Sequence, residues 1–98
     1  MPLLWVTIPN ELANIYLEKG EYEVAAKYID QALRLFRTEE SRFPTHLVLG
    51  KYYLETAQID SSEYYLQKAL SSPSLQTHAG ALKYLSYVKE KQSAWIES

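Results

Sequence analysis

The apolar residues of this chain recur every three or four positions, which predicts amphipathic α-helices and not strands. Leu12, Ile15 and Tyr16 share one helical face, and Gly20 follows as a helix-ending residue. The next segment places its apolar face on Val24, Ala25, Tyr28, Ile29, Ala32, Leu33 and Phe36. The whole pattern predicts an all-α chain with helices near 8–19, 22–36, 44–56, 60–71 and 74–91, and a last helical stub from about 94.

Capping residues mark several of these boundaries. Pro9 suits the first turn of a helix, with Thr7 upstream as its cap. Asp60 or Ser61 can cap the fourth helix, and the segment 71–74 ends that helix and can cap the fifth. The helices are therefore expected to be short and separated by defined turns.

Two parts of the chain repeat each other without a gap. Residues 16–33 and 53–70 both open with Tyr-Leu-Glu and close with Ala-Leu, at an offset of 37 residues. A weaker third copy begins at Leu85, with its turn expected at 91–93. Such a period holds two helices and two turns, so it predicts stacked helical pairs.

The residue types at the repeated positions resemble the tetratricopeptide repeat. Small residues recur at Ala13 and Gly50, Ala25 and Ser62, and Ala32 and Ala69, and large ones at Leu12 and Leu49, Tyr16 and Tyr53, and Ile29 and Leu66. The resemblance covers roughly residues 7–95. It implies a single domain over 1–98, an α-α superhelix of about two and a half repeats at 7–40, 44–74 and, in part, 78–98.

The sequence departs from the family pattern in two places. The period is two or three residues longer, which places extra residues in the polar connector 37–44, and Lys89 stands where the family prefers an aromatic residue. The long period and the run 60–70 resemble bacterial multi-repeat proteins. Because neither end of the repeat array shows a polar cap, we expect this chain to be a piece of a longer protein, or its ends to associate with another copy.

The resemblance implies a non-catalytic scaffold that binds a protein or peptide on its concave face. In the family, the first helix of each repeat lines that face. The residues expected there are Asn10, Asn14, Leu17, Glu18, Leu47, Lys51, Leu54, Glu55, Lys83, Tyr87 and Glu90.

Asn10 and Asn14 are the strongest candidates on this face. Asparagine is unfavourable inside a helix and can both donate and accept hydrogen bonds, so a pair four residues apart indicates a binding role. Family members that hold chaperone tails use a two-carboxylate clamp, and of its residues only Asn14 is matched here. That clamp is therefore excluded.

Composition removes other classes of function. The net charge is −2 and 22% of the residues are charged, so no broad positive field favours nucleic acid. Without cysteine there is neither a disulfide nor a thiolate metal site. The apolar start 3–6 is too short to insert into a membrane. Absence of cysteine suits the cytoplasm without excluding the periplasm.

Candidate chemistry is sparse. His46 and His78 have no clustered partner ligands in the sequence, and His46 fits a packing position better than a metal site. Glu18 and Glu55 are explained by the repeat and not by acid–base catalysis. Neither a metal, a cofactor nor an enzymatic activity is expected. The nine tyrosines, at helical spacing, predict core packing and not base stacking.

Two alternatives to peptide binding stay open. The apolar terminal residues Trp5, Val6, Trp95 and Ile96 could join copies of the chain, which predicts a structural, self-associating segment or a homodimer. The domain could instead be the sensory or regulatory part of a larger bacterial signalling protein or transcription regulator.

Overall fold

The computed structural model describes the backbone of residues 2–97 and the side chains of residues 9–93. Within these residues the chain is helical and has no strand, which confirms the all-α prediction. The elements in chain order are α1 (Pro2–Glu18), α2 (Tyr22–Leu35), the 3-10 turn η1 (Glu40–Arg42), α3 (Phe43–Glu55), α4 (Ile59–Ala69) and α5 (Leu75–Glu97).

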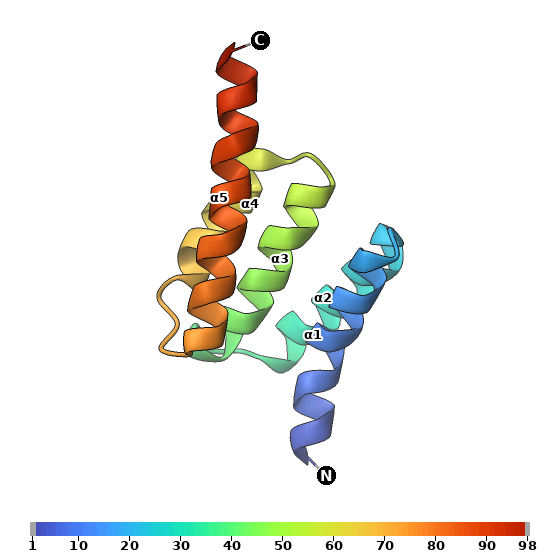
Figure 1. Ribbon diagram of the computed structural model, residues 1–98. Coiled ribbons are helices and arrows are strands. Elements are labelled where there is room, and N and C mark those ends of the chain that lie inside the picture. Colours follow the sequence, from blue (N-terminus) through green and yellow to red (C-terminus); the bar gives the residue numbers. More distant parts are fainter. Residues whose placement is uncertain (1, 98) are drawn as a thin grey trace.

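The helices stack as two pairs followed by a single helix. Helix α1 packs against α2, α3 packs against α4, and α5 packs against both α4 and α3. In Figure 1, α2 lies behind α1 and α4 lies behind α5. Helix α3 also contacts α1 and α2, so it joins the two pairs, and the molecule extends over 50 × 29 × 18 Å.

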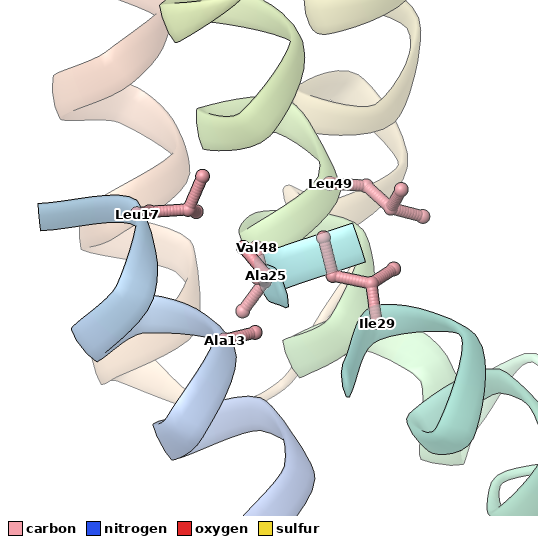
Figure 2. Close-up of a cluster of buried hydrophobic side chains, with 6 residues drawn as sticks. All are labelled: Ala13, Leu17, Ala25, Ile29, Val48 and Leu49. Carbon is pink, nitrogen blue, oxygen red and sulfur yellow. The ribbon is translucent and has the colours of Figure 1, made fainter. Parts of the chain in front are cut away.

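The core between the first three helices is small and aliphatic (Figure 2). Its buried members are Ala13, Leu17, Ala25, Ile29, Val48 and Leu49. Tyrosines, among them Tyr16, Tyr28, Tyr53 and Tyr65, are partly buried against this cluster. The prediction that tyrosine serves packing is confirmed at these positions, where the side chains are partly buried against the core.

Both helical pairs turn through a residue with positive φ. Gly20 follows α1 with a φ of 80°, and Ala57 follows α3 with a φ of 64°. In each turn the next backbone N–H returns to the helix, from Glu21 to the Tyr16 carbonyl at 2.9 Å and from Gln58 to the Tyr53 carbonyl at 2.8 Å. Gly20 was predicted to end its helix and does so.

The predicted start of the first helix is wrong. Residue Pro9 does not open the helix, because α1 already begins at Pro2 and runs through it. A proline removes one backbone hydrogen bond, and a helix can continue across that single loss when its other turns are satisfied. Thr7 accordingly lies inside α1 and is not its cap.

The predicted turn at 91–93 and the separate stub from 94 are also wrong. Helix α5 is continuous from Leu75 to Glu97. Ser93 occupies the position equivalent to Gly20 and Ala57, yet it remains helical. A turn is stabilised by the partner helix that folds back after it, and Lys89 offers no aromatic ring on which such a partner would pack.

The connector and the caps differ in part from expectation. The 37–44 segment contains η1 and the first residues of α3, and the Arg42 guanidinium donates to the carbonyls of Phe36 at 2.6 Å and Leu33 at 3.0 Å. Helix α4 starts at Ile59 without a side-chain cap, so neither Asp60 nor Ser61 caps it. The Ser74 hydroxyl does accept the Thr77 N–H, at 3.4 Å, as predicted.

Candidate functional site

A groove of about 500 Å³ lies along α1, α3 and the start of α5. Three residues predicted for the concave face line it, namely Asn10, Asn14 and Leu47. The other lining residues are Glu11, Phe36, Ser41, Pro44, Val48, Ser74, Gln76 and Thr77. The extended connector thus supplies one wall, and the first turn of α5 supplies another.

A chain of side-chain contacts crosses the three helices beside this groove. The Lys51 ammonium on α3 donates to the Asn14 amide oxygen on α1 at 2.7 Å. The same ammonium lies 5.3 Å from the ring centroid of Tyr84 on α5. This cation–π contact and the hydrogen bond hold the Lys51 ammonium between α1 and α5.

A second polar contact joins α1 to α3 nearer the connector. The Thr45 hydroxyl, which is buried, donates to the Asn10 amide oxygen at 3.0 Å. Asn10 and Asn14 are therefore both held by their oxygen atoms, and both are half-buried. The two asparagines singled out by the sequence lie together on one side of the groove.

A smaller hollow of about 110 Å³ continues the surface toward the other end of the helices. It is lined by Leu17, Glu18, Lys51, Leu54, Glu55 and Tyr84. Leu17 is only 5% exposed and belongs to the core, so it forms the floor. The Glu55 carboxylate accepts a hydrogen bond from the Tyr22 hydroxyl at 3.4 Å.

The remaining predicted residues lie on α5 and are exposed. Lys83 places its ammonium 5.6 Å from the Tyr84 ring centroid, and Tyr87 packs edge-on against the same ring with centroids 5.7 Å apart. Tyr84 was not among the predicted binding residues, although it touches three of them. Its signal in the sequence was its position one helical turn before Tyr87 and next to Lys83.

Residue His46 lies apart from this surface. It is 4% exposed, packs its ring 5.7 Å from that of Tyr65, and has no hydrogen-bond partner at Nδ1 among the described residues. Burial lowers the pKa of His46, and the nearby charges of Lys68 and Arg42 lower it further against the opposing effect of Glu39. His46 is a neutral packing residue at neutral pH.

Two other kinds of site are absent from the described residues. Among these residues, no group of three His, Cys, Asp or Glu side chains is placed to hold a metal ion. None of the described helices is long and apolar enough to cross a membrane.

The stacked helical pairs with a shared groove define a helical-repeat protein. The sequence matches the model of the family described as Tetratricopeptide repeat over residues 6–72, so the chain belongs to the tetratricopeptide repeat family. The match spans α1 to α4 and ends before α5. No curated protein and no solved structure matches the chain. Repeats of this family generally serve as non-catalytic scaffolds for protein–protein interaction.

Proposed function

We propose that this chain is a binding module that holds a peptide segment of a partner protein on the face formed by α1, α3 and α5. The observation that carries the proposal is the contact chain from Asn14 through Lys51 to Tyr84. It places polar and aromatic groups from three helices on one surface, next to a groove of about 500 Å³. Grooves of this size, apolar with a few fixed polar groups, are typical of binding sites.

The chemistry of this face supports binding without catalysis. Its described side chains hold neither a nucleophile paired with a general base nor a metal-ligand cluster. Lys51 has no carboxylate within salt-bridge distance among the described residues, and its contacts are to a neutral amide and a ring. These groups orient a ligand and have no means to transform it.

The chain offers a matched control surface for testing this proposal. On the outer helix α4, the Lys68 ammonium lies 5.0 Å from the Tyr64 ring centroid, which reproduces the Lys51–Tyr84 contact away from the groove. A library of random twelve-residue peptides displayed on phage is selected against the whole chain, and the selected peptides are synthesised. Their affinities are then measured by calorimetry.

The expected result separates the two surfaces. Lys51→Met and Tyr84→Leu should each weaken the selected peptides at least tenfold, while Lys68→Met and Tyr64→Leu leave the affinity within about twofold. Circular dichroism should show that all four variants remain folded. Equal losses on both surfaces, or a selection that yields no binding peptide, would reject the proposal.

One observation favours self-association as the second candidate function. Helix α5 exposes Leu75 by 85% and Leu82 by 52%, and the two are seven residues apart along the helix. The terminal residues also predicted to join copies lie outside the described side chains. A dimer that forms with rising concentration and is lost in Leu82→Lys would support this function, whereas a monomeric light-scattering mass at high concentration would count against it.

A further inference from the structure

A hollow of about 230 Å³ lies between α2 and α3, and none of its lining residues belongs to the groove along α1, α3 and α5. We call it the α2–α3 hollow. In Figure 2 two of its residues, Ile29 and Leu49, lie on the right of the core cluster, with Ala13 and Leu17 of α1 on the left. The other lining residues are Ala26, Asp30, Leu33, Tyr52 and Tyr53. The lining is therefore apolar and aromatic except for the Asp30 carboxylate.

The next helical junction, between α4 and α5, is joined by a side-chain bond that the first junction lacks. There the Gln92 amide donates to the Glu63 carboxylate at 3.4 Å. The residue equivalent to Glu63 in the first pair is Ala26, which has no polar side-chain group. The residue equivalent to Gln92 is Thr56, whose hydroxyl donates to the Tyr52 carbonyl of its own helix at 3.0 Å. No bond of this kind therefore spans the α2–α3 hollow.

The two groups that give the α2–α3 hollow its chemistry are not repeated at the second junction either. Gln67 stands at the position equivalent to Asp30, so the carboxylate is replaced by a neutral amide. Val88 stands at the position equivalent to Tyr52 and is fully buried. The combination of a carboxylate with an aromatic ring is thus specific to α2 and α3 and does not follow from the repeat pattern.

The tyrosine rings of this chain attract cations. Lysine ammonium groups lie between 5.0 and 5.6 Å from the ring centroids of Tyr16, Tyr64 and Tyr84. The Tyr52 ring packs at 77° to that of Tyr53, with centroids 5.3 Å apart. Among the described residues, no lysine or arginine lies over the Tyr52 ring. Tyr52 therefore offers a cation from another molecule the kind of surface that the chain's own lysines use elsewhere.

The Asp30 carboxylate already pairs with a guanidinium. The Nη2 atom of Arg34, one helical turn further along α2, lies 3.0 Å from the Asp30 Oδ2 atom. Both side chains are mostly exposed, so solvent and salt screen this pair and it contributes little. A second guanidinium that also contacts an aromatic ring and apolar side chains can therefore displace Arg34 from Asp30.

We infer that the α2–α3 hollow receives one arginine side chain of a partner protein. Its guanidinium pairs with Asp30 and stacks on the Tyr52 ring, and its methylene stem lies against Leu33 and Leu49. Arginine fits better than lysine, because the planar guanidinium combines bidentate pairing to a carboxylate with stacking on a ring. This contact is separate from the proposed function, since it uses residues that the groove does not.

The test is an NMR titration of the whole isotope-labelled chain with N-acetylarginine amide. Saturable shifts should be confined to the amides of residues 26–33 and 49–53. The citrulline analogue keeps the shape of the arginine probe but is neutral, so it should bind roughly tenfold more weakly. The lysine analogue keeps the charge but lacks the planar fork, and it should bind about threefold more weakly.

Substitutions assign the contacts. Asp30→Asn should weaken the arginine probe roughly tenfold, and Tyr52→Leu should remove its advantage over the lysine probe. Arg34→Met removes the competing guanidinium and should strengthen binding about twofold, which a purely structural role of the ion pair would not produce. Asp60→Asn removes the same charge from the exposed first turn of α4 and should leave the affinity unchanged. Circular dichroism checks that each variant remains folded.

Several outcomes would overturn the inference. They are equal binding of the citrulline analogue, an unchanged affinity in Asp30→Asn, shifts confined to other residues, or no saturable shift up to about 20 mM probe. Tighter binding of N-acetylphenylalanine amide at the same residues would show that the hollow takes an aromatic side chain instead. None of these results bears on the groove, whose function is tested by Lys51→Met and Tyr84→Leu, so the two proposals fail separately.

Discussion

The two helical pairs carry the same aromatic contact 37 residues apart. In the first pair, the rings of Tyr16 and Tyr28 stack with centroids 5.7 Å apart and planes at 8°. In the second, Tyr53 and Tyr65 stack at 5.6 Å and 13°. The repeat is thus reproduced in geometry as well as in residue type, since each stack joins the first helix of its pair to the second.

The pairs differ at the small residues that face each other. The first pair has Ala13 and Ala25, whereas the second has Gly50 and Ser62 at the equivalent positions. The Ser62 hydroxyl donates to the Gly50 carbonyl at 2.7 Å in a buried bond, and Leu66 packs directly over the Gly50 backbone. The second pair therefore depends on the absence of a side chain at residue 50, and the first does not.

The largest expected effect follows from filling that space. In Gly50→Ala the new Cβ would overlap the Leu66 side chain, so we expect the free energy of unfolding to fall by about 2–3 kcal/mol. Urea denaturation followed by circular dichroism measures this change. The reciprocal substitution in the first pair, Ala13→Gly, should cost about 1 kcal/mol. A loss below about 0.5 kcal/mol in Gly50→Ala would show that the second pair does not depend on the absence of a side chain at residue 50.

The buried hydroxyl can be removed to make the second pair resemble the first. Ser62→Ala deletes the bond to the Gly50 carbonyl, and we expect a loss of about 1 kcal/mol in the same denaturation assay. The carbonyl also lies within helix α3, so the loss stays at the size of one neutral hydrogen bond. If Ser62→Ala is as stable as the original chain, the hydroxyl contributes nothing to the difference between the pairs.

The two turns offer an exchange with effects of opposite sign. Ala57 adopts a positive φ that disfavours a Cβ atom, so Ala57→Gly should raise the midpoint of unfolding, by the equivalent of up to about 1 kcal/mol. Gly20→Ala, in the same conformation, should lower stability by about 1 kcal/mol. Calorimetry measures the midpoint of unfolding of both variants. If the two midpoints shift in the same direction, residues 20 and 57 do not share the backbone geometry proposed for them.

The effect expected to be smallest at neutral pH concerns His46, which takes the place that Pro9 has in the first pair. Burial, the first cause, lowers the pKa of His46 below 6.5, the value expected for the unfolded chain. The neutral His46 side chain therefore contributes its full stabilisation above pH 6.5, and this stabilisation is lost as the pH falls from 6.5 toward the lowered pKa.

Replacing the histidine isolates that contribution. His46→Leu should be less sensitive to acid than the original chain, as measured by the midpoint of urea unfolding at intervals from pH 7.5 to pH 5. The difference between the two curves should grow as the pH falls. Parallel curves would show that His46 has the same pKa in the folded and unfolded chain.

Local pattern was sufficient for much of the fold. The 3–4 spacing of apolar residues predicted five helices, the offset of 37 residues predicted their pairing, and Gly20 and Ser74 marked two boundaries correctly. The errors occurred where no local signal decides. Pro9 is a common helix start but is tolerated inside α1, and helix α5 continues through residues 91–93, where a turn was predicted.

The candidate site was predictable only as a set of positions. The resemblance to the family assigned Asn10, Asn14 and Lys51 to one face, because the first helix of each repeat lines that face in the family. It did not indicate that Lys51 bonds to Asn14, or that Tyr84 completes the contact. Those contacts depend on the distance between neighbouring helices.

By itself, the sequence determined the helical class, the repeat and the family, since each of these is written in residue types at fixed spacing. The tertiary structure alone decided that α5 continues without a turn, that Leu17 is buried in the core, and that the Lys51 ammonium donates to the Asn14 amide oxygen. Periodicity specifies the face of a helix on which a side chain lies. The atoms that the side chain meets are set by the packing of helices that are distant in the chain.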